Sequence, residues 1–508
     1  MPTVSFRVFV DYDPVMEKDA AGYVSMMGEL LSKGTTSRTK AQLDQEVDFI
    51  GANLSSNGNG VAGGCLSKHT DKLLELMSDV LLNPAFPEDE LTKAKVRAES
   101  NLAANKDDAD AIAGNVASIL RYGKDHPYGE VMTEASLAKI SLEQIRNHYQ
   151  NYFKPNIAYL VVVGDITKAQ AMTKAEKYFG KWASGKAPTH TYAVPKAPEK
   201  TQVHFVHKPG AVQSVINITY PVQLAPGTAD VIPGSLTNTI LGGGFINSRL
   251  NLNLREGKAY TYGAYSSLSS DKLIGSFNAA ASVRNAVTDS AIIEFMKELN
   301  RLRTEKVSAE DLQLVKNVMT GQFSRSLEQP GTIANFALNT VRYNLAADYY
   351  ENYLTTLQNV DADKVMRMAQ KYMLPENAHI LVVGNKDDVA KSLAQFSAAG
   401  KIRYYDTYGN PIEDVENAIP AGVTAETIIS DYIDAIGGTK KIGTLKDVHM
   451  EVTLSTPMGE LGMKMSQKGG TKVAQSISMQ GQVVSNRVYD GTTAFESGMG
   501  GARDLNNK

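Results

Sequence analysis

The sequence predicts an α+β protein that contains two copies of one domain, followed by a β-rich segment. Three observations lead to this prediction: a long-range internal repeat, helical and strand-like stretches in the same order in both copies, and period-two patterning near the C-terminus. Each copy is expected to form a mixed sheet with helices packed on one face. The length of 508 residues agrees with this division, since one hydrophobic core rarely serves more than about 250 residues.

The repeat is anchored by residues 152–164 and 372–384, which align without a gap at a constant offset of 220. Tyr, Pro, Ala, Val, Val and Gly recur at matching positions. Each segment follows a helical stretch and turns at its Pro into a run typical of a central strand. The alternative is a chance recurrence of a common helix–Pro–strand–Gly pattern. The order of the other elements favours duplication.

The elements of the first copy recur in the second. The first copy has a strand at 3–11, a helix around Ala20 to Leu31 that ends at Gly34, a strand pair within 49–67, a helix at 71–82 and a long helical stretch at 88–121. The second copy has strands at 202–207 and 214–220 and helices at 229–241 and 287–304. A Pro/Lys-rich stretch at 186–200 is the expected linker between the copies.

The segment after the second copy has a different character. An amphipathic helix follows Thr424 and ends at Gly437-Gly438, and period-two stretches at 448–454, 462–467 and 473–479 predict strands. This segment resembles the start of an outer-membrane lipoprotein-carrier domain. We therefore predict domains at 1–195 and 196–405, a linker at 406–423 and a partial β-rich domain at 424–508.

The composition argues against several classes of function. Hydrophobic residues make up 43% of the chain and charged residues 21%, and no apolar run is long enough to cross a bilayer. The net charge is -3 with scattered Lys and Arg, so no nucleic acid is expected as a partner. The single cysteine, Cys65, excludes an internal disulfide and a thiolate metal cluster.

Two stretches carry a resemblance to a known family. Residues 241–265, LGGGFINSRLNLNLREGKAYTYGAY, closely resemble the second-domain signature of insulinase-type (pitrilysin-like, inverted zinc) metallopeptidases. Residues 22–38, GYVSMMGELLSKGTTSR, resemble the stretch that holds the zinc-binding helix in that family. The resemblance extends over about residues 1–405. It implies two tandem insulinase-type domains, the first of which is expected to lack the family's usual first strand.

The zinc motif of this family, H-x-x-E-H on a helix, is degenerate here. The motif places two His ligands on one helix face and a Glu that activates the bound water. The corresponding positions hold Ser25, Gly28 and Glu29. Whether Glu99 is a remnant of the family's third ligand cannot be decided from the sequence. We predict no metal in this chain and expect zinc in a partner subunit.

A second set of family residues is intact. In the resembled family an Arg and a Tyr seven residues later contact the bound peptide beside the zinc, and these residues correspond to Arg255 and Tyr262. An Arg offers a fixed set of donors to carbonyl groups, and a Tyr hydroxyl can donate to the oxyanion of peptide hydrolysis. The alternative is an ion-paired Arg255 and a Tyr262 that simply belongs to a Tyr-rich strand.

The resemblance also implies residues that bind peptide. Asn53 and Ser55 lie where the family presents an edge strand to extended substrate, although an ordinary polar hairpin explains this stretch equally well. Gly243 and Gly244 belong to a Gly-rich turn that allows close backbone approach and is not a phosphate loop.

The favoured hypothesis is a zinc-lacking subunit of a heterodimeric, periplasmic or envelope peptidase. Such a subunit would bind unfolded peptides and complete the active site of a zinc-bearing partner through Arg255 and Tyr262, contributing to proteolysis only within the hetero-oligomer. One alternative is a fully non-catalytic peptide-binding or scaffold protein of the same fold. Another is an autonomous peptidase with a different nucleophile, which has little support because no G-x-S-x-G elbow is present.

Overall fold

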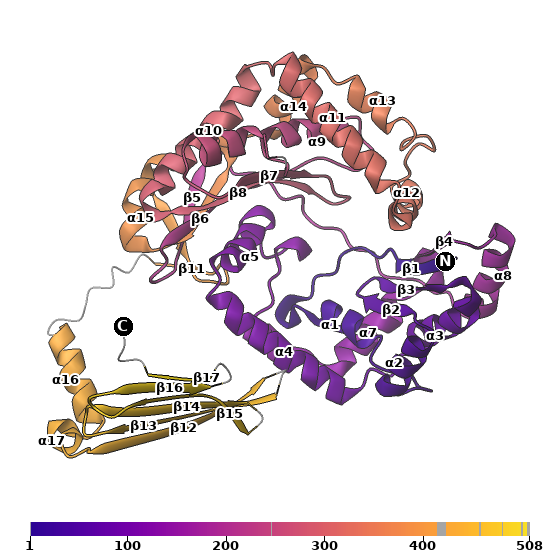
Figure 1. The fold of residues 1–508 in the computed structure, drawn as a ribbon. Coiled ribbons are helices and arrows are strands. Elements are labelled where there is room, and N and C mark those ends of the chain that lie inside the picture. Colours follow the sequence, from indigo (N-terminus) through magenta and orange to yellow (C-terminus); the bar gives the residue numbers. More distant parts are fainter. Residues whose placement is uncertain are drawn as a thin grey trace. The chain divides into compact units, whose positions relative to one another are not determined.

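The computed structural model (Figure 1) describes residues 2–244, 246–413, 423–456, 459–479, 481–498 and 501–504. The chain divides into two compact units, Met1–Asp414 and Val415–Lys508. Phe245 of the Gly-rich signature and residues 414–422 of the predicted linker lie outside the described residues. No helix in the described ranges is both long enough and apolar enough to span a bilayer.

The first half of the larger unit is built on a four-stranded sheet with the order β2-β3-β1-β4. All three strand pairs are antiparallel, so the mixed character expected for this sheet is absent from the described strands. The strands are β1 (Thr3–Val10), β2 (Asn53–Asn57), β3 (Gly60–Leu66) and β4 (Ala158–Gly164). The helices are α1 (Tyr23–Leu30), α2 (Lys40–Phe49), α3 (Thr70–Leu82), α4 (Glu88–Lys106), α5 (Ala109–Tyr122), α6 (Glu134–Lys139), α7 (Leu142–Tyr152) and α8 (Lys168–Phe179).

The second half carries a seven-stranded mixed sheet with the order β11-β10-β5-β9-β6-β8-β7. Strand β5 pairs in parallel with β9 and β10, whereas the other pairs are antiparallel. The strands are β5 (Gln202–His207), β6 (Gln213–Val222), β7 (Ala264–Ser269), β8 (Gly275–Arg284), β9 (His379–Gly384), β10 (Ile402–Tyr405) and β11 (Pro411–Ile412). The helices are α9 (Val231–Leu241), α10 (Thr288–Thr304), α11 (Ala309–Ser326), α12 (Pro330–Arg342), α13 (Tyr353–Gln358), α14 (Ala362–Tyr372) and α15 (Lys386–Leu393).

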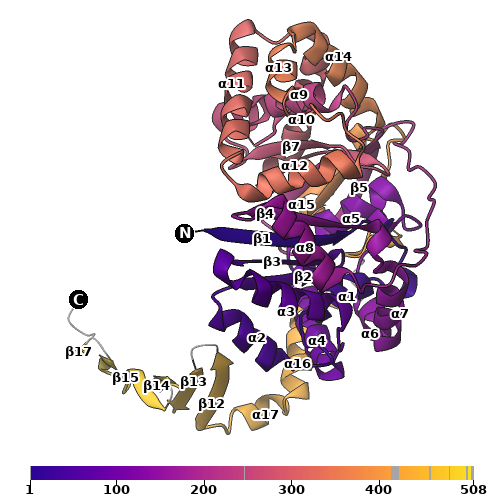
Figure 2. The same ribbon diagram turned by 90° about the vertical axis from the view of Figure 1, so that its right-hand side faces the viewer.

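Each half of the larger unit packs one of its helices against the sheet of the other half. Helix α5 buries Ile112, Ala113 and Val116 against the second sheet, where they meet residues of β5, β6 and β9. Helix α12 lies along β4 of the first sheet (Figure 2). Arg342 Nε of α12 is 2.8 Å from Asp11 Oδ1. Helices therefore cover both faces of the sheets, with the helix on the second face supplied by the other half.

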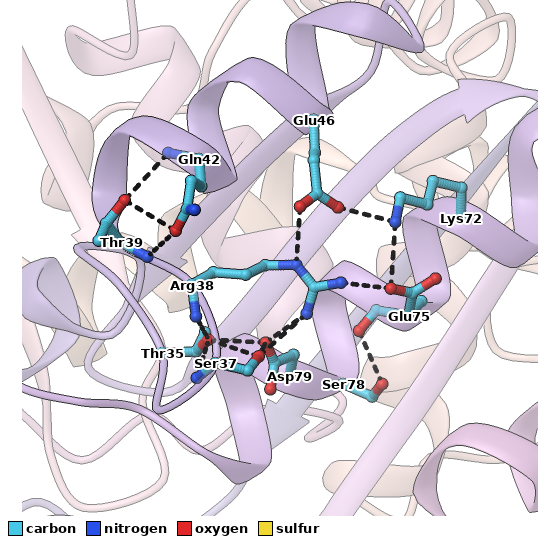
Figure 3. Close-up of polar contacts among 10 residues, drawn as sticks. All are labelled: Thr35, Ser37, Arg38, Thr39, Gln42, Glu46, Lys72, Glu75, Ser78 and Asp79. Atoms are coloured by element: carbon cyan, nitrogen blue, oxygen red, sulfur yellow. Dashed lines mark hydrogen bonds and ion pairs between the residues drawn. The ribbon is translucent and has the colours of Figure 1, made fainter.

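The loop after α1 is fixed by a partly exposed charge cluster in which only Asp79 is buried (Figure 3). Arg38 lies between Glu46, Glu75 and Asp79, with Nε 3.0 Å from Glu46 Oε1 and Nη1 2.7 Å from Asp79 Oδ2. Burial alone would raise the pKa of Asp79, but hydrogen bonds from Thr35 and its neighbours lower the pKa instead. The arginine of the zinc-helix segment is thus structural, since it ties this loop to α2 and α3.

The smaller unit contains helix α16 (Ala425–Ala435), which starts at a capping box formed by Thr424, and helix α17 (Gly438–Ile442). Its antiparallel sheet follows the chain order β12-β13-β14-β15-β16-β17. The strands are β12 (Asp447–Thr456), β13 (Gly459–Lys468), β14 (Lys472–Met479), β15 (Gln482–Tyr489), β16 (Ala494–Gly498) and β17 (Gly501–Asp504). The predicted helix and the three predicted strands are confirmed as α16, β12, β13 and β14.

Several sequence predictions needed correction. The helical stretch predicted for 88–121 is two helices, because Asp108 caps a new helix by accepting from the N–H groups of Asp110 and Ala111. Residues 40–49 form helix α2, which was not predicted, since only Leu43 of this helix is buried. Part of the predicted linker, Pro411–Ile412, adds strand β11 to the edge of β10.

Candidate functional site

Helix α1 holds the positions of the degenerate zinc motif. Ser25 is exposed on this helix, and Glu29 pairs with Arg97 of α4 and lies 3.7 Å from Lys33. A carboxylate that two cations already neutralise is a poor single ligand for zinc. Glu99 is exposed on α4, two residues beyond Arg97. The side chains at these positions therefore do not fit a zinc ion.

Gly28 lies where the family motif has its catalytic Glu, and the structure leaves no room for a side chain there. A Cβ atom at Gly28 would be 2.1 Å from Gly58 N and 2.2 Å from the carbonyl carbon of Asn57. Ser56 fixes this close approach, because its hydroxyl donates to Gly28 O over 2.6 Å. The β2–β3 hairpin thus packs directly on the backbone of α1.

No group of three His, Cys, Asp or Glu side chains able to hold a metal ion occurs in the part of the chain that the structure describes. Two histidines do meet across neighbouring strands, with His204 Nε2 3.0 Å from His379 Nδ1. Burial, together with nearby positive charge, lowers the pKa of His204 to about 2 and that of His379 to about 4. Both rings are neutral at physiological pH and pack beneath α5.

A third buried histidine, His148 of α7, lies beside α1. The rings of Tyr12, Tyr23 and Tyr152 surround it at centroid distances of 5.2, 5.6 and 4.6 Å. Neither ring nitrogen of His148 has a hydrogen-bond partner within the described ranges. Burial lowers the pKa of His148 to about 4, so this residue is neutral when the chain is folded at neutral pH.

Strand β2 is one of the two edge strands of the first sheet, and β4 is the other. The two-residue turn at Gly58-Asn59 makes Asn57 and Gly60 a hydrogen-bonded pair, so alternate residues along β2 bond to β3. The backbone groups of Leu54 and Ser56 consequently point away from the sheet, and we find no partner for them among the described residues. A cavity of about 460 Å³ between α1, α2 and β2 borders this edge.

The predicted peptide-binding residues Asn53 and Ser55 lie on this strand, but with a different geometry from the one the sequence suggested. Their backbone groups face β3, and their exposed side chains point to the face opposite the helices. The residues that offer backbone hydrogen bonds are Leu54 and Ser56. Sequence reasoning missed them because the inward and outward residues of a strand differ only in register.

The second sheet ends in β7, whose outer edge is closed. Gly242 O accepts from Ser266 N over 2.8 Å, and the side chain of Asn238 donates to Ser266 O over 3.1 Å. Asn251 Oδ1 accepts from Ala264 N over 3.0 Å. The outward N–H groups of Ala264 and Ser266 and the C=O group of Ser266 are therefore used within the protein.

The Gly-rich turn forms part of this closure. Gly243 N and Gly242 N both donate to Asn238 O, and a Cβ at Gly243 would be 2.7 Å from Thr239 Cα. Gly244 has a φ of 80°, which favours glycine. The turn ends α9 and brings Gly242 against β7. The peptide-binding role predicted for Gly243 and Gly244 stays a prediction.

Arg255 and Tyr262 both precede β7 in the chain, and both lie in solvent-accessible positions. Arg255 belongs to the π-helical segment Asn251–Gly257, and its Nε is 3.3 Å from Glu256 Oε1. Because both side chains are partly exposed, this ion pair is weak. Tyr262 is 91% exposed, in a segment held by the hydrogen bond from Thr261 Oγ1 to Ser282 O. Both residues are free to contact a ligand, and their catalytic role stays a prediction.

The two halves correspond position by position around these features. The segments 25–34 and 235–244 align without a gap at an offset of 210, which pairs Ser25 with Ser235, Gly28 with Asn238 and Glu29 with Thr239. The same offset pairs Ser56 with Ser266, and both serines bond to the paired helix position. This second alignment was the sequence signal that would have placed β2 and β7 as equivalent edges.

Comparisons with known proteins agree on one family. The family model described as insulinase (peptidase family M16) matches residues 2–125, and the model described as peptidase M16 inactive domain matches residues 139–319. An uncharacterized zinc protease of Rickettsia felis is 25% identical over 370 residues, which cover 69% of this chain and 84% of that protein. A non-peptidase homolog, YmxG, of Helicobacter pylori is 20% identical over 378 residues, which cover 73% of this chain and 86% of that protein.

Solved structures show the same fold. A peptidase M16 inactive domain from Pseudomonas fluorescens superimposes with a TM-score of 0.70 at 20% identity, covering 76% of this chain and 93% of that structure. A protease from Helicobacter pylori superimposes with a TM-score of 0.67 at 19% identity, covering 75% and 94%. At this identity the likeness establishes the fold and carries no statement about activity.

Proposed function

The chain belongs to the insulinase-type peptidase family (M16), and from this premise we propose that it is a zinc-lacking subunit that binds extended peptides and completes the active site of a zinc-bearing partner. The observation that carries the proposal is the contrast within the first half. The hairpin at Asn57-Gly58 fills the space beside Gly28, and Arg97 already pairs with Glu29, so the zinc positions are not available to a metal ion. Strand β2 beside them is an edge strand whose outward backbone groups are open.

The geometry of β2 supports the proposal that it binds peptide. An extended peptide can add to an open strand edge through main-chain hydrogen bonds, which place little demand on the peptide's sequence. Leu54 and Ser56 would supply the N–H and C=O groups, and the hydrogen bond from Ser56 to Gly28 holds this part of the strand against α1. Unfolded polypeptide is the substrate class that such an edge favours.

The role proposed for Arg255 and Tyr262 is support of the reaction at the partner's zinc. The guanidinium of Arg255 would hold a carbonyl of the bound peptide, and the hydroxyl of Tyr262 would donate to the oxyanion formed when water attacks the scissile amide. Their exposure supports contact with a ligand, since neither side chain is committed to the core. Zinc on the partner would supply the activated water.

The names of two relatives support the same direction. YmxG of Helicobacter pylori is called a non-peptidase homolog and YmfF of Bacillus subtilis a probable inactive metalloprotease. A location in the periplasm or cell envelope, together with a heterodimeric assembly, belongs to this proposal.

The test is a peptidase assay on an internally quenched, unstructured peptide, with and without a co-expressed zinc-bearing M16 homologue, with zinc measured in each subunit. The proposal predicts activity only in the mixture and zinc only in the partner. Tyr262→Phe should lower kcat of the mixture about 100-fold, as loss of an oxyanion donor does. Arg255→Ala should lower the activity of the mixture because it removes the donors that hold the peptide carbonyl. Tyr265→Phe, an exposed tyrosine on neighbouring β7, is the matched control and should leave kcat unchanged.

Two results would count against the proposal in different ways. Stoichiometric zinc and activity in this chain alone would show an autonomous peptidase. Unchanged activity of the mixture with Arg255→Ala would instead leave a non-catalytic peptide-binding or scaffold protein.

A further inference from the structure

The second half contains an open cavity of about 580 Å³ that the function proposed above does not use. Helix α9 and strand β7 form one wall, and α11, α12 and the start of α13 form the other. The wall from α9 and β7 presents hydroxyl and amide groups, including Ser235, Thr239 and Ser267. The opposite wall is aromatic.

Four aromatic rings line this second wall as a continuous stack. The ring centroids of Phe323 and Tyr353 are 4.3 Å apart, those of Phe336 and Tyr350 are 3.8 Å apart, and Phe323 joins the two pairs at 5.8 Å from Phe336. All four rings are partly exposed. Aromatic faces that remain accessible in a concave site attract apolar and aromatic groups, since burying such a group releases about 25 cal/mol for each Å² removed from water.

The charge of the cavity narrows the ligand class further. Each described residue that lines it is uncharged: serine, threonine, asparagine, glutamine, glycine, leucine, methionine, phenylalanine or tyrosine. A phosphate, a carboxylate or an ammonium group would lose its hydration there without gaining an opposite charge. The complementary ligand is a neutral aromatic or large apolar group attached to a hydrogen-bonding backbone.

The position of the cavity within the repeat connects it to peptide binding. Ser235, Asn238 and Thr239 line it, and these residues occupy the positions of Ser25, Gly28 and Glu29 in the first half. The cavity therefore lies in the second half where the degenerate zinc position lies in the first. Because β7 is closed at Ala264 and Ser266, this site cannot take a peptide as an added strand. It can hold a side chain.

We propose that this cavity, between α9, β7, α11 and α12, binds the aromatic or large aliphatic side chain of an unfolded polypeptide. The inference rests on the proposed function, since both assume an unfolded polypeptide as ligand, and it adds a preference for apolar aromatic residues. Strand β2 would then hold peptide backbone without regard to sequence, and the cavity would select segments that contain a large apolar residue.

The test uses the full chain and a short, uncharged, Ser/Thr/Gly-rich peptide with one central p-benzoylphenylalanine as a photo-crosslinking probe. The proposal predicts crosslinks on α11 and α12. An unlabelled peptide with phenylalanine at the probe position should inhibit these crosslinks at about one tenth of the concentration that its serine analogue needs. Ser235→Trp places a large ring into the cavity from an exposed helix position and should lower the α11 and α12 crosslinks about tenfold. Ser324→Trp, exposed on α11 outside the cavity, should leave them unchanged.

The outcomes separate the two proposals. The cavity proposal would be overturned if the unmodified chain gave no crosslinks on α11 or α12. Crosslinks on β2 that persist in Ser235→Trp would then leave peptide binding at β2 intact. Equal competition by the phenylalanine and serine peptides would also overturn it. Crosslinks on α11 and α12 that Leu54→Pro leaves unchanged would support the cavity as a site independent of β2.

Discussion

The two halves of the larger unit have equivalent edge strands, β2 and β7, that differ in whether their outward backbone groups are already hydrogen-bonded. In the first half the outward backbone groups of Leu54 and Ser56 on β2 remain open, whereas in the second half the equivalent Ala264 and Ser266 on β7 bond to Asn251, Gly242 and Asn238. One helix position contributes to this difference, together with Gly242 and Asn251. Gly28 lets the first hairpin lie on the backbone of α1, and Asn238 instead reaches out to β7.

This contrast indicates how a duplicated fold can divide its roles. Under the proposed function, the first half keeps a strand edge for peptide backbone beside a zinc position that the hairpin fills. The other half closes its edge and opens an uncharged aromatic cavity at the corresponding place. The following predictions are ordered by the size of the expected effect.

The largest effect is expected on peptide binding. Leu54→Pro removes an outward N–H group of β2 and places a ring at the edge, where Pro is compatible with the strand but not with a further strand. We expect the affinity for an unstructured peptide, measured by fluorescence anisotropy, to fall about 100-fold. Leu54→Val keeps the N–H group and should bind within about twofold of the unmodified chain. Equal losses in both variants would contradict strand addition at β2.

A large effect on stability is expected at the helix position that separates the two halves. Gly28→Ala forces a Cβ atom to 2.1 Å from Gly58 N, so the hairpin must move away from α1. We expect the free energy of unfolding to fall by about 2.5 kcal/mol, within the upper range for overpacking. Gly114→Ala, at an α5 position with no atom within 4 Å of the added carbon, should raise it by about 0.5–1 kcal/mol.

Because the space beside Gly28 is filled, we expect that introducing the H-x-x-E-H residues into α1 does not restore zinc binding. A chain with Ser25→His, Gly28→Glu and Glu29→His should not take up stoichiometric zinc, because the glutamate has no space beside Gly58. Metal content after dialysis against zinc measures this directly. Full zinc occupancy with an unchanged Tm would contradict the packing described at α1.

A smaller and pH-dependent effect is expected at His148, whose equivalent in the second half, 220 residues later, is the buried Met368. The pKa of His148 is about 4 in the folded chain and about 6.5 when unfolded, so the unfolded state binds more protons between these values. Stability is thus present above pH 6.5 and lost as the pH falls toward 4. Protonation of His148 in the unfolded state should lower the free energy of unfolding by about 2 kcal/mol at pH 5 relative to pH 8.

His148→Met should remove that part of the pH dependence. The measurement is urea unfolding at pH 5 and pH 8, and the variant should lose less stability between the two than the unmodified chain does. His204→Phe provides a comparison at another buried histidine, which lies in the second sheet and contacts His379. An unchanged pH dependence in His148→Met would show that His148 is protonated or hydrogen-bonded when the chain is folded.

Much of this fold was predictable because local patterns agreed with the packing. In helix α14 the apolar residues that recur at helical spacing are the residues that the fold buries. The repeated Tyr, Pro and Gly positions predict strands β4 and β9. Helix α2 escaped prediction because its single buried residue, Leu43, leaves almost no apolar periodicity. The exchange of α5 and α12 between sheets is a tertiary contact that no local pattern encodes.

The site was predictable only in part for a similar reason. The loss of the zinc motif at Ser25, Gly28 and Glu29 is visible in the sequence, but the hairpin that fills the space beside Gly28 and the partner Arg97 are distant along the chain. The closure of β7 by Asn238 depends on a side chain crossing between two elements. Such contacts follow from the assembled fold rather than from spacing.

The most direct test of the account is amide hydrogen exchange of the full chain, followed by mass spectrometry, with and without an unstructured Ser/Thr/Val-rich peptide. The account predicts slower exchange in β2, Asn53–Asn57, when the peptide is present, and no change in β7, Ala264–Ser269, whose outward amides at Ala264 and Ser266 are already bonded. Slower exchange in β7 with none in β2 would contradict the assignment of β2 as the peptide-binding edge.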